Sequence, residues 1–337
     1  MILIGDKNQY KANLHCHSNL SDGKLSPEKL KEIYKENGYS VLAITDHEYP
    51  YDHSAMTEDG FVMLTGYEAY IRPSPTCTYD IYSPEIHINL FAKDENNVSY
   101  VNYVPMYCKY IKDEKYRDAL PKVGSSEPRK YTAEYINSFV ENAKENGYIC
   151  AYNHPVWSLE EHEMISEYRG FFSMEMCNWG AHLASRIEYN GALYDRLLRE
   201  GKRIFCHGSD DNHNFHPLNS PKSDSFGAFT VINAEKLDYA SVISALEHGD
   251  FYSSMGPMIN ELRIDGERVT IKTSDAMQIM MHSGSKKVKF EIAALGEYIS
   301  EASFDIPKDA PYVRFSVLDY NGRHADTRGY FRDELGI

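Results

Sequence analysis

The sequence predicts an α/β protein, a TIM-like barrel of strand–helix units followed by a small all-β domain. From residue 10 to about 250, short apolar runs alternate with segments that carry helix start and stop signals. Such alternation predicts parallel strands with helices packed outside them. Seven or eight strand candidates favour a closed barrel over an open sheet. After residue 256 the pattern changes to short alternating runs separated by turn dipeptides, which is typical of β-hairpins.

The predicted strands of the first part are short apolar runs, and most of them end in a polar side chain. They comprise residues 12–15, 41–45, 61–67, 86–91, 148–153, 171–177, 203–208 and 228–233. In a barrel enzyme the active site is assembled from the carboxyl ends of successive strands. The polar residues at these ends are therefore the candidates for chemistry.

The predicted helices lie between these strands. Ser26-Pro27 opens a helix that ends at Gly38, with proline at the first helical position, where its missing N–H costs nothing. Ser158-Leu159-Glu160-Glu161 has the pattern of a capping box, which predicts a helix that ends at Gly170. The remaining predicted helices cover residues 132–147, 182–200 and 238–249.

Two segments fall outside the alternation. Residues 93–131 are rich in Tyr and charged side chains without periodicity, and loops of this length are usually functional or disordered. This insertion is either a lid beside the catalytic face or a packed surface segment. Asp265-Gly266, Ser283-Gly284 and Asn321-Gly322 separate the strand-like runs after residue 256. We therefore predict a domain over residues 1–255 and a β domain over residues 256–337, whose role is packing, oligomerisation or substrate shaping.

Composition excludes several classes of protein. The 337 residues are 42% apolar and carry a formal net charge of -15, from 50 acidic and 35 basic side chains. The sequence shows no basic patch or stripe of the kind that indicates an extended nucleic-acid surface. No signal peptide is recognisable, and no run approaches the ~20 apolar residues that span a bilayer. The six cysteines form no CxxC pair, so we expect a reducing, cytoplasmic location and no membrane association.

The first three predicted strands end in groups that bind metal. His15 and His17 are two residues apart, so on a strand both imidazoles point to the same face and can reach one ion. Asp22 follows in a Ser-Asp-Gly turn, where its other possible role is turn formation. Asp46-His47 pairs a ligand with a carboxylate that can orient the imidazole. Glu68 ends the third strand, and a carboxylate there can bridge two cations.

Further candidate ligands follow the later strands. His154 stands before a proline that ends its strand, and Asp211 and His213 again have the i, i+2 spacing. His87 lies within a strand, where it is either a ligand or a core histidine. Mixed nitrogen and oxygen ligands suit Zn, Mn or Fe, and the lack of cysteine argues against a closed structural zinc site. We expect two or three catalytic metal ions.

Taken in order, HxH, SDG, TDH, Glu, His, NHP and DxH resemble the PHP family, named for polymerase and histidinol phosphatase domains, over roughly residues 10–255. The resemblance implies a distorted seven-stranded β/α barrel with up to three ions at its carboxyl face. The implied ligands are His15, His17 and Asp211 at the first site, the bridging Glu68, His87 and His154 at the second, and Asp22, His47 and His213 at the third. The extra aspartate in Ser209-Asp210-Asp211-Asn212-His213 leaves the role of Asp210 open, and the Glu68–His87 interval is longer than expected for the family.

The implied function is that of a metal-dependent phosphoesterase that hydrolyses a phosphate ester by a metal-bridging hydroxide. The acidic charge favours a small phosphorylated molecule or a short nucleotide as substrate. One alternative is hydrolysis of a carboxylic ester, amide or carbamate on the same metal site. Another is a noncatalytic PHP-like binding module, which loss of ligands would signal.

Residues beyond the metal ligands are assigned more loosely, and no catalytic residue is separable from the ligands themselves. Asp46 and His207 are candidates for the shell behind the ligands. The candidates for substrate binding are Arg72, Asn178, Arg186 and Lys222. The three cationic candidates, Arg72, Arg186 and Lys222, are equally compatible with ordinary surface positions.

Overall fold

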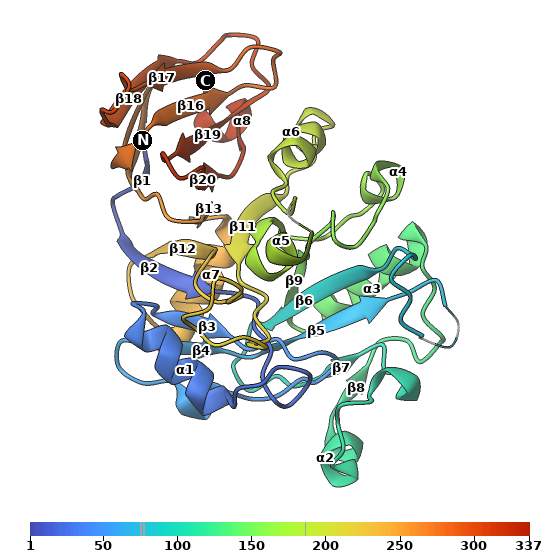
Figure 1. Cartoon of the computed structure of the whole chain (residues 1–337). Coiled ribbons are helices and arrows are strands. Elements are labelled where there is room, and N and C mark those ends of the chain that lie inside the picture. Colours follow the sequence, from blue (N-terminus) through green and yellow to red (C-terminus); the bar gives the residue numbers. More distant parts are fainter. Residues whose placement is uncertain (75, 77, 186) are drawn as a thin grey trace.

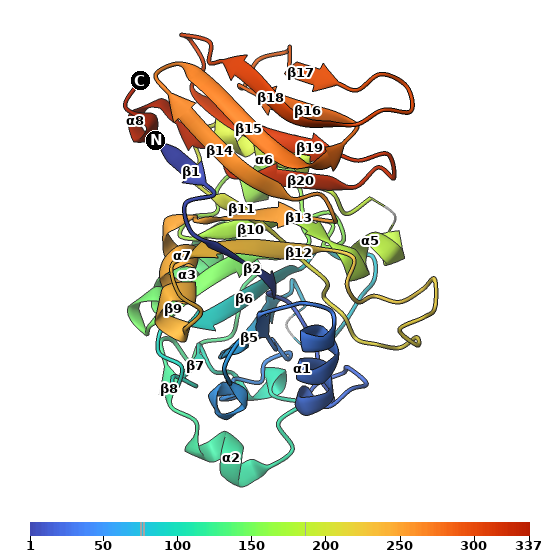
Figure 2. The ribbon, with the colours of Figure 1, turned by 90° about the vertical axis from the view of Figure 1, so that its left-hand side faces the viewer.

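The computed structural model describes residues 1–74, 76, 78–185 and 187–337, and it is a mixed α/β structure (Figure 1). It has two large sheets, one of five strands in the first part of the chain and one of ten strands shared with the C-terminal part. A further sheet of four strands lies in the C-terminal part (Figure 2). Five of the cysteines are buried and free, whereas Cys77 lies outside the described residues. Within the described ranges, no helix is long and apolar enough to cross a membrane.

A five-stranded sheet carries much of the candidate site. Its spatial order is β11 (Phe205–Ser209), β10 (Ser173–Asn178), β9 (Tyr148–Tyr152), β6 (Ile86–Ala92) and β5 (Gly66–Ile71). β9, β10 and β11 are parallel, but β6 runs antiparallel to both β5 and β9. The prediction of parallel strands is therefore wrong for β6. For β6 to run parallel to β5, the chain would need a crossover of a dozen or more residues, usually a helix. No helix lies among the described residues between β5 and β6.

A ten-stranded sheet joins the first part of the chain to the C-terminal part. Its main path is β17 (Lys289–Ile292), β16 (Gln278–His282), β19 (Tyr312–Leu318), β20 (His324–Thr327), β13 (Phe251–Ser254), β12 (Phe229–Ala234), β2 (Asn8–Asn13), β3 (Val41–Ala43) and β4 (Val62–Leu64). β21 (Tyr330–Phe331) pairs with β19 beside this path. β2, β3 and β4 are parallel as predicted, but β12 is antiparallel to β2.

The expected closed barrel is not confirmed, because no backbone ladder joins the two sheets among the described residues. Near β11 and β12 the Thr230 hydroxyl accepts from the Gly208 N–H at 3.2 Å and donates to the Gly208 carbonyl at 2.8 Å. Beyond the ends of β2 and β11, Cys16 and Asn212 form an isolated parallel bridge. Near β3 and β5 the connection is an isolated bridge between His47 and Glu68. The sheets meet at two edges without a closed ring of strand pairs.

Four helices begin or end at the predicted signals. The Ser26, Thr132 and Asp238 side chains cap α1 (Pro27–Glu36), α3 (Ala133–Glu145) and α7 (Tyr239–His248) by accepting from backbone N–H groups of the first turn. Gly249 ends α7 at φ 74°, a left-handed conformation that glycine adopts without strain. α6 (Gly191–Arg199) ends before Gly201 as predicted.

Two predicted helices are wrong in their extent. In place of a helix over 158–170 there is only α4 (His162–Ile165), because Leu159 takes φ 56° and interrupts any helix that starts at Ser158. In place of one helix over 182–200 there are α5 (Trp179–Ser185) and α6. Between them, Tyr189 forms an antiparallel bridge with Cys177 of β10, which holds this part of the chain extended.

The C-terminal strands form the hairpins that the turn dipeptides predict. β14 (Ile259–Asp265) and β15 (Arg268–Ala276) are antiparallel around Gly266, and β18 (Ile299–Asp305) extends their sheet. On the other side of β14 lies β1 (Ile2–Ile4), and β13 pairs with β20. α8 (Arg332–Leu335) closes the chain. Strand pairing thus runs across residue 255, and the domain boundary placed there stays a prediction.

Candidate metal centre

The nine predicted ligands converge on one region at the ends of the strands. His15 and His17 follow β2, His47 follows β3, and Glu68 and His87 lie in β5 and β6. His154 follows β9, and Asp211 and His213 follow β11. Asp22 is supplied by the loop before α1. Their side-chain nitrogen and oxygen atoms form four overlapping groups, each compact enough to surround an ion. The described residues therefore bring all nine predicted ligands together.

Glu68 is the centre of this cluster and is fully buried. Its Oε1 atom lies 3.1 Å from His15 Nε2, 3.1 Å from His87 Nδ1 and 3.5 Å from His154 Nε2. Its Oε2 atom lies 2.8 Å from His47 Nδ1 and 3.5 Å from His17 Nε2. Each carboxylate oxygen thus faces its own set of imidazoles, which is the arrangement that a bridging ligand requires.

Asp211 faces Glu68 from β11. Its Oδ1 atom is 3.0 Å from His17 Nε2 and 3.2 Å from His15 Nε2. The neighbouring Asp210 points away and accepts from the Tyr34 hydroxyl and three backbone N–H groups of residues 226–228. The alignment of Asp211 with the cluster therefore agrees with the structure, and Asp210 fixes the loop behind it.

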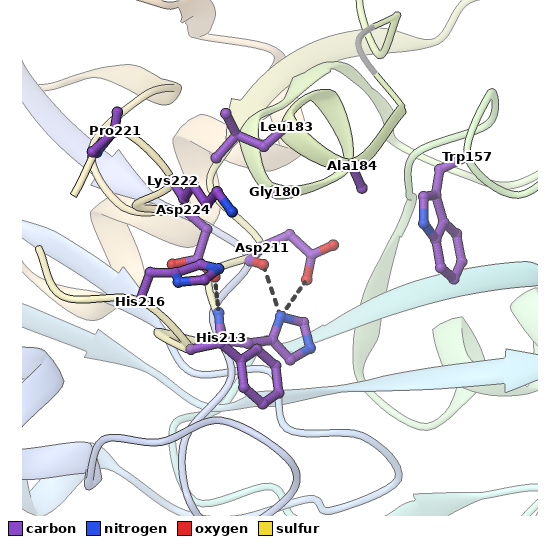
Figure 3. Close-up of a pocket in the computed structure, with 12 residues that line it drawn as sticks. Trp157, Gly180, Leu183, Ala184, Asp211, His213, His216, Pro221, Lys222 and Asp224 are labelled. Carbon is purple, nitrogen blue, oxygen red and sulfur yellow. Dashed lines mark hydrogen bonds and ion pairs between the residues drawn. The ribbon is translucent and has the colours of Figure 1, made fainter.

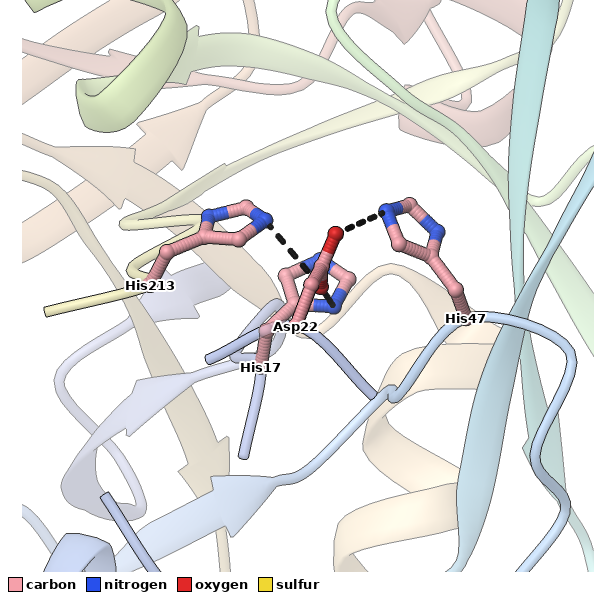
Figure 4. Close-up of side chains that lie close together, drawn as sticks. All are labelled: His17, Asp22, His47 and His213. Carbon is pink, nitrogen blue, oxygen red and sulfur yellow. Dashed lines mark ion pairs between the residues drawn. The ribbon is translucent and has the colours of Figure 1, made fainter. Parts of the chain in front are cut away.

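A third group lies toward solvent around Asp22 (Figure 4). The Asp22 carboxylate lies 3.8 Å from His17 Nδ1, 3.7 Å from His47 Nε2 and 3.6 Å from His213 Nε2. These distances are too long for direct hydrogen bonds. The three imidazoles nevertheless point toward one carboxylate, as a shared cation would require.

The donor set fits divalent cations. His17 Nδ1, His47 Nδ1, Glu68 Oε2 and His87 Nε2 are buried without a hydrogen-bond partner, although His47 Nδ1 and Glu68 Oε2 are only 2.8 Å apart. Buried polar atoms without partners are costly, and a divalent cation bound among these four would give them one. Among the described residues, the cluster carboxylates pair with histidines and with no lysine or arginine. Imidazole with carboxylate is the donor set of Zn, Mn and Fe sites.

Electrostatics in the cluster are dominated by mutual pairing. Burial alone raises the pKa of Glu68, but the imidazoles of His87, His15 and His47 outweigh it and hold that pKa well below its usual value. Burial lowers the pKa of His87, yet the carboxylates of Glu68 and Glu85 raise it to about 10. Without metal, His87 therefore keeps a proton near pH 7.

Glu175 is a functional residue that we did not predict. It lies in β10, fully buried, with Oε1 2.9 Å from His15 Nδ1. Its Oε2 atom accepts from the His154 backbone N–H and from Asn178 Nδ2, each at 2.8 Å, and Ser209 donates its hydroxyl to Oε1. The signal was one charged residue in the apolar run Phe-Phe-Ser-Met-Glu-Met-Cys. Its role is to orient two ligands from behind.

Asp46 and His207 lie close behind the ligands, but their contacts differ from those expected. Asp46 accepts from the backbone and hydroxyl groups of Ser18 and Ser21, so it anchors the loop before Asp22 and does not orient His47. His207 Nδ1 lies 2.9 Å from the Ser173 hydroxyl, and its Nε2 atom is 4.0 Å from Glu175. His207 therefore lies beside Glu175 without a hydrogen bond to it.

The candidate substrate residues divide into three kinds. Asn178 is fully buried and donates to Glu175 and, at 3.1 Å, to Asp211 Oδ2, so it positions a ligand instead of facing substrate. Arg72 forms an ion pair with Glu85 and stacks on Tyr70, with its guanidinium 4.2 Å from the ring centre. Lys222 lies at the edge of a neighbouring pocket. Arg186 is outside the described residues.

Two pockets open next to the cluster and share Trp157, Asp211 and His213. One, of about 350 Å³, holds most of the candidate ligands together with Arg72 and Lys109. The other, of about 450 Å³, has Lys222 at its edge and Leu183 and Phe215 in its wall (Figure 3). Cations and apolar side chains thus surround the cluster on the side open to solvent.

The 93–131 insertion contributes to the first pocket. Tyr110 donates its hydroxyl to Asp22 Oδ2 at 3.2 Å, and its ring stacks on His47. Both ends of the insertion are tied to buried Glu48, the residue after His47, through the Tyr100 hydroxyl at 2.5 Å and the Arg129 guanidinium. The insertion is therefore packed onto the cluster, and it supplies Lys109 and Tyr110 to the pocket.

One comparison with known protein families gives a match. Residues 13–176 match the family model described as the PHP domain. The histidine and carboxylate groups described above could hold metal ions. No curated protein matches the chain.

Three solved structures that match the chain are distant from it in sequence. A two-domain protein from Bacteroides vulgatus that contains a predicted PHP-like metal-dependent phosphoesterase is 13% identical, covers 97% of this chain and 88% of its own, and has a TM-score of 0.46. A protein from Bifidobacterium adolescentis, described as a candidate metal-dependent phosphoesterase, is 16% identical over 62% of this chain and 90% of its own, with a TM-score of 0.39. An amidohydrolase from Chromobacterium violaceum with bound sulfate and no metal is 14% identical over 60% and 87%, with a TM-score of 0.40.

Proposed function

We propose that this protein hydrolyses a phosphate ester of a small molecule or short nucleotide, with two or three divalent ions of Zn, Mn or Fe held by the nine ligands. The observation that carries the proposal is the position of Glu68, whose two oxygens face different sets of imidazoles. When bound, such ions supply a nucleophile from water near neutral pH and polarise the phosphoryl group.

The residues of the chain supply orientation and charge. Glu175 and Asn178 hold His15, His154 and Asp211 from behind, so the ligand atoms need little rearrangement. Arg72 and Lys109 line the ligand pocket, and Lys222 lies at the edge of the neighbouring one. Positive groups at these positions favour a phosphate, which carries up to two negative charges, over a neutral carbonyl group.

The size of the pockets supports a small substrate. Volumes of about 350 and 450 Å³ suit a drug-sized or nucleotide-sized molecule. A long nucleic acid would need a basic track, and the net charge is -15.

The test is metal analysis of the purified protein followed by assays on phosphomonoesters, phosphodiesters and carboxylic esters. We expect at least two bound ions per chain and turnover of one phosphoester class. Turnover of carboxylic esters alone, or no phosphoester turnover in the metal-loaded protein, would rule the proposal out. Glu68→Gln is the matching variant: retention of both metal content and activity would show that Glu68 is not the bridge.

A further inference from the structure

The segment of residues 187–190, just before α6, lies between the metal cluster and the C-terminal strands. We infer that Glu188 and Tyr189 of this segment are positioning residues, which fix the loop carrying His154 and Trp157 and tie that loop to β20. The inference rests on the proposed metal centre. It gives the C-terminal strands a part in the site although they contribute no ligand.

Glu188 contacts the loop that carries His154 and Trp157. Its side chain is fully buried, and its carboxylate accepts from the backbone N–H groups of Val156 at 3.3 Å and Trp157 at 2.6 Å. Asn190 Nδ2 donates to the same carboxylate at 2.8 Å. An ionised carboxylate only accepts hydrogen bonds, so it can satisfy all three donors at once. No described lysine or arginine forms an ion pair with it, so backbone and amide groups are what hold it.

The loop that Glu188 holds is strained and carries residues of the site. His154 takes φ 22°, which a residue with a side chain adopts only when its surroundings impose it. The Trp157 ring lies 4.9 Å from the His154 ring and 5.5 Å from the His87 ring, measured between centroids. Trp157 also lines both pockets. Holding the Trp157 backbone therefore fixes a ligand and a wall of the substrate site together.

Tyr189 contacts the C-terminal strand β20. Its hydroxyl donates to Asp326, with the two carboxylate oxygens at 3.0 and 3.1 Å, and its ring stacks on His324 at 4.4 Å. Both partners belong to β20. Asp326 is itself buried and receives hydrogen bonds from Arg314 at 2.9 Å and Ser316 at 2.5 Å. The C-terminal sheet thus presents a fixed, buried acceptor to Tyr189.

The segment is also attached to β10, which carries Glu175. The Asn190 N–H donates to the Met176 carbonyl at 2.8 Å, and Asn190 Nδ2 donates to the Glu175 carbonyl at 2.9 Å. Contacts therefore continue from β20 through Tyr189 and Glu188 to the loop of His154. Loosening either residue should move His154 relative to Glu68.

The test compares Glu188→Gln and Tyr189→Phe with the unmodified protein, by titration calorimetry with Mn²⁺ and by counting the ions bound. Changes behind metal ligands typically lower affinity 10–100-fold. We expect a loss of that size for Glu188→Gln and a smaller loss in the same direction for Tyr189→Phe, which is the variant less disturbing to folding. Glu163→Gln, an exposed change on α4, is the matched control and should bind as the unmodified protein does.

Tyr312→Phe is the control for Tyr189→Phe. The Tyr312 hydroxyl donates to Asp195 at 3.1 Å in the same interface but does not reach residues 188–190. If Tyr312→Phe weakens Mn²⁺ binding as much as Tyr189→Phe, the effect is a general weakening of the interface and the inference is wrong. Unchanged affinity in both Glu188→Gln and Tyr189→Phe would also overturn it.

A readout independent of metal comes from fluorescence. The chain has two tryptophans, so Trp179→Phe leaves Trp157 as the reporter. In that background, we expect Glu188→Gln to shift the emission to longer wavelength and to increase quenching by acrylamide. If the unmodified protein binds no metal, the proposed metal centre fails, and unchanged Trp157 emission then separately rejects the positioning role.

Discussion

His15 Nδ1 lies 2.9 Å from Glu175 Oε1, and both side chains are completely buried. This contact leaves His15 Nε2 to face Glu68 and Asp211. Burial raises the pKa of Glu175, but the His15 imidazole outweighs it and brings that pKa to about 2. The carboxylate therefore stays ionised and holds the ring in the orientation that a metal ligand needs.

Glu175→Gln should lower metal affinity about 10–100-fold without unfolding the protein. The amide keeps the shape but loses the charge, and it brings a donor to a place where Ser209, Asn178 and the His154 N–H already donate. Titration calorimetry measures the affinity, and circular dichroism checks the fold. Glu167→Gln, on the surface, is the control. Equal affinities in the two variants would contradict the prediction.

Metal uptake should release protons. The carboxylates of Glu68 and Glu85 raise the pKa of His87 to about 10 against the effect of burial, so near pH 7 the metal-free protein holds a proton that a ligand must lose. Affinity should then rise by up to about tenfold per pH unit for each proton displaced. Calorimetry in buffers of different ionisation enthalpy counts these protons. A count of zero at pH 7 would contradict the prediction.

The metal-free protein should lose stability as the pH rises from 6.5 toward 10. A histidine whose pKa is higher in the folded state stabilises that state fully below its unfolded pKa, and the contribution disappears as the pH passes the folded pKa. For His87 this window runs from 6.5 to about 10, with a slope of at most about 1.4 kcal/mol per pH unit. Urea unfolding with EDTA at pH 7 and 9.5 measures the slope. The dependence of the free energy of unfolding on pH should be weaker in His87→Gln.

Arg129→Met should destabilise the protein by about 3–5 kcal/mol, because it leaves Glu48 as a buried charge without its cation. The insertion should also become a site of proteolysis, since one of its two attachments is lost. Urea unfolding and limited trypsin digestion measure the two effects. Adding Glu48→Gln should recover part of the stability, and a double variant less stable than Arg129→Met would argue against this account.

Lys109→Ala should raise KM for phosphoester substrates roughly fivefold, about 1 kcal/mol for a solvent-accessible charge contact, with little change in metal content. Lys109 lines the ligand pocket, whereas Lys112, in the same insertion, is exposed and does not. Lys112→Ala is therefore the matched control. Steady-state kinetics on the substrate found in the assay panel test the difference, and equal KM values for the two variants would remove Lys109 from the substrate site.

Most of the ligand positions were predictable because they follow the ends of strands, and strand ends are visible in a single sequence. Glu68 and His87 instead lie within β5 and β6, so the prediction that Glu68 ends its strand was wrong. The residues that hold the ligands from behind were harder to predict from the sequence. Glu175 lies in a strand that reads as core, and Asp46 stands beside a ligand that it does not touch. The direction of β6 and the break between α5 and α6 depend on contacts made far along the chain, such as those of Tyr189, and local periodicity does not record these.

β1 pairs with β14, which lies more than two hundred residues further along the chain. β1 therefore cannot pair until β14 has been synthesised. During synthesis the residues that carry the metal ligands emerge before that partner exists, and pairings of such long range form slowly. Assembly of the C-terminal sheet is therefore expected to be the last step of folding. Tyr189 rests on β20 of the ten-stranded sheet, which is synthesised after β14, so a newly made chain would acquire its full affinity for metal only once β20 has paired in that sheet.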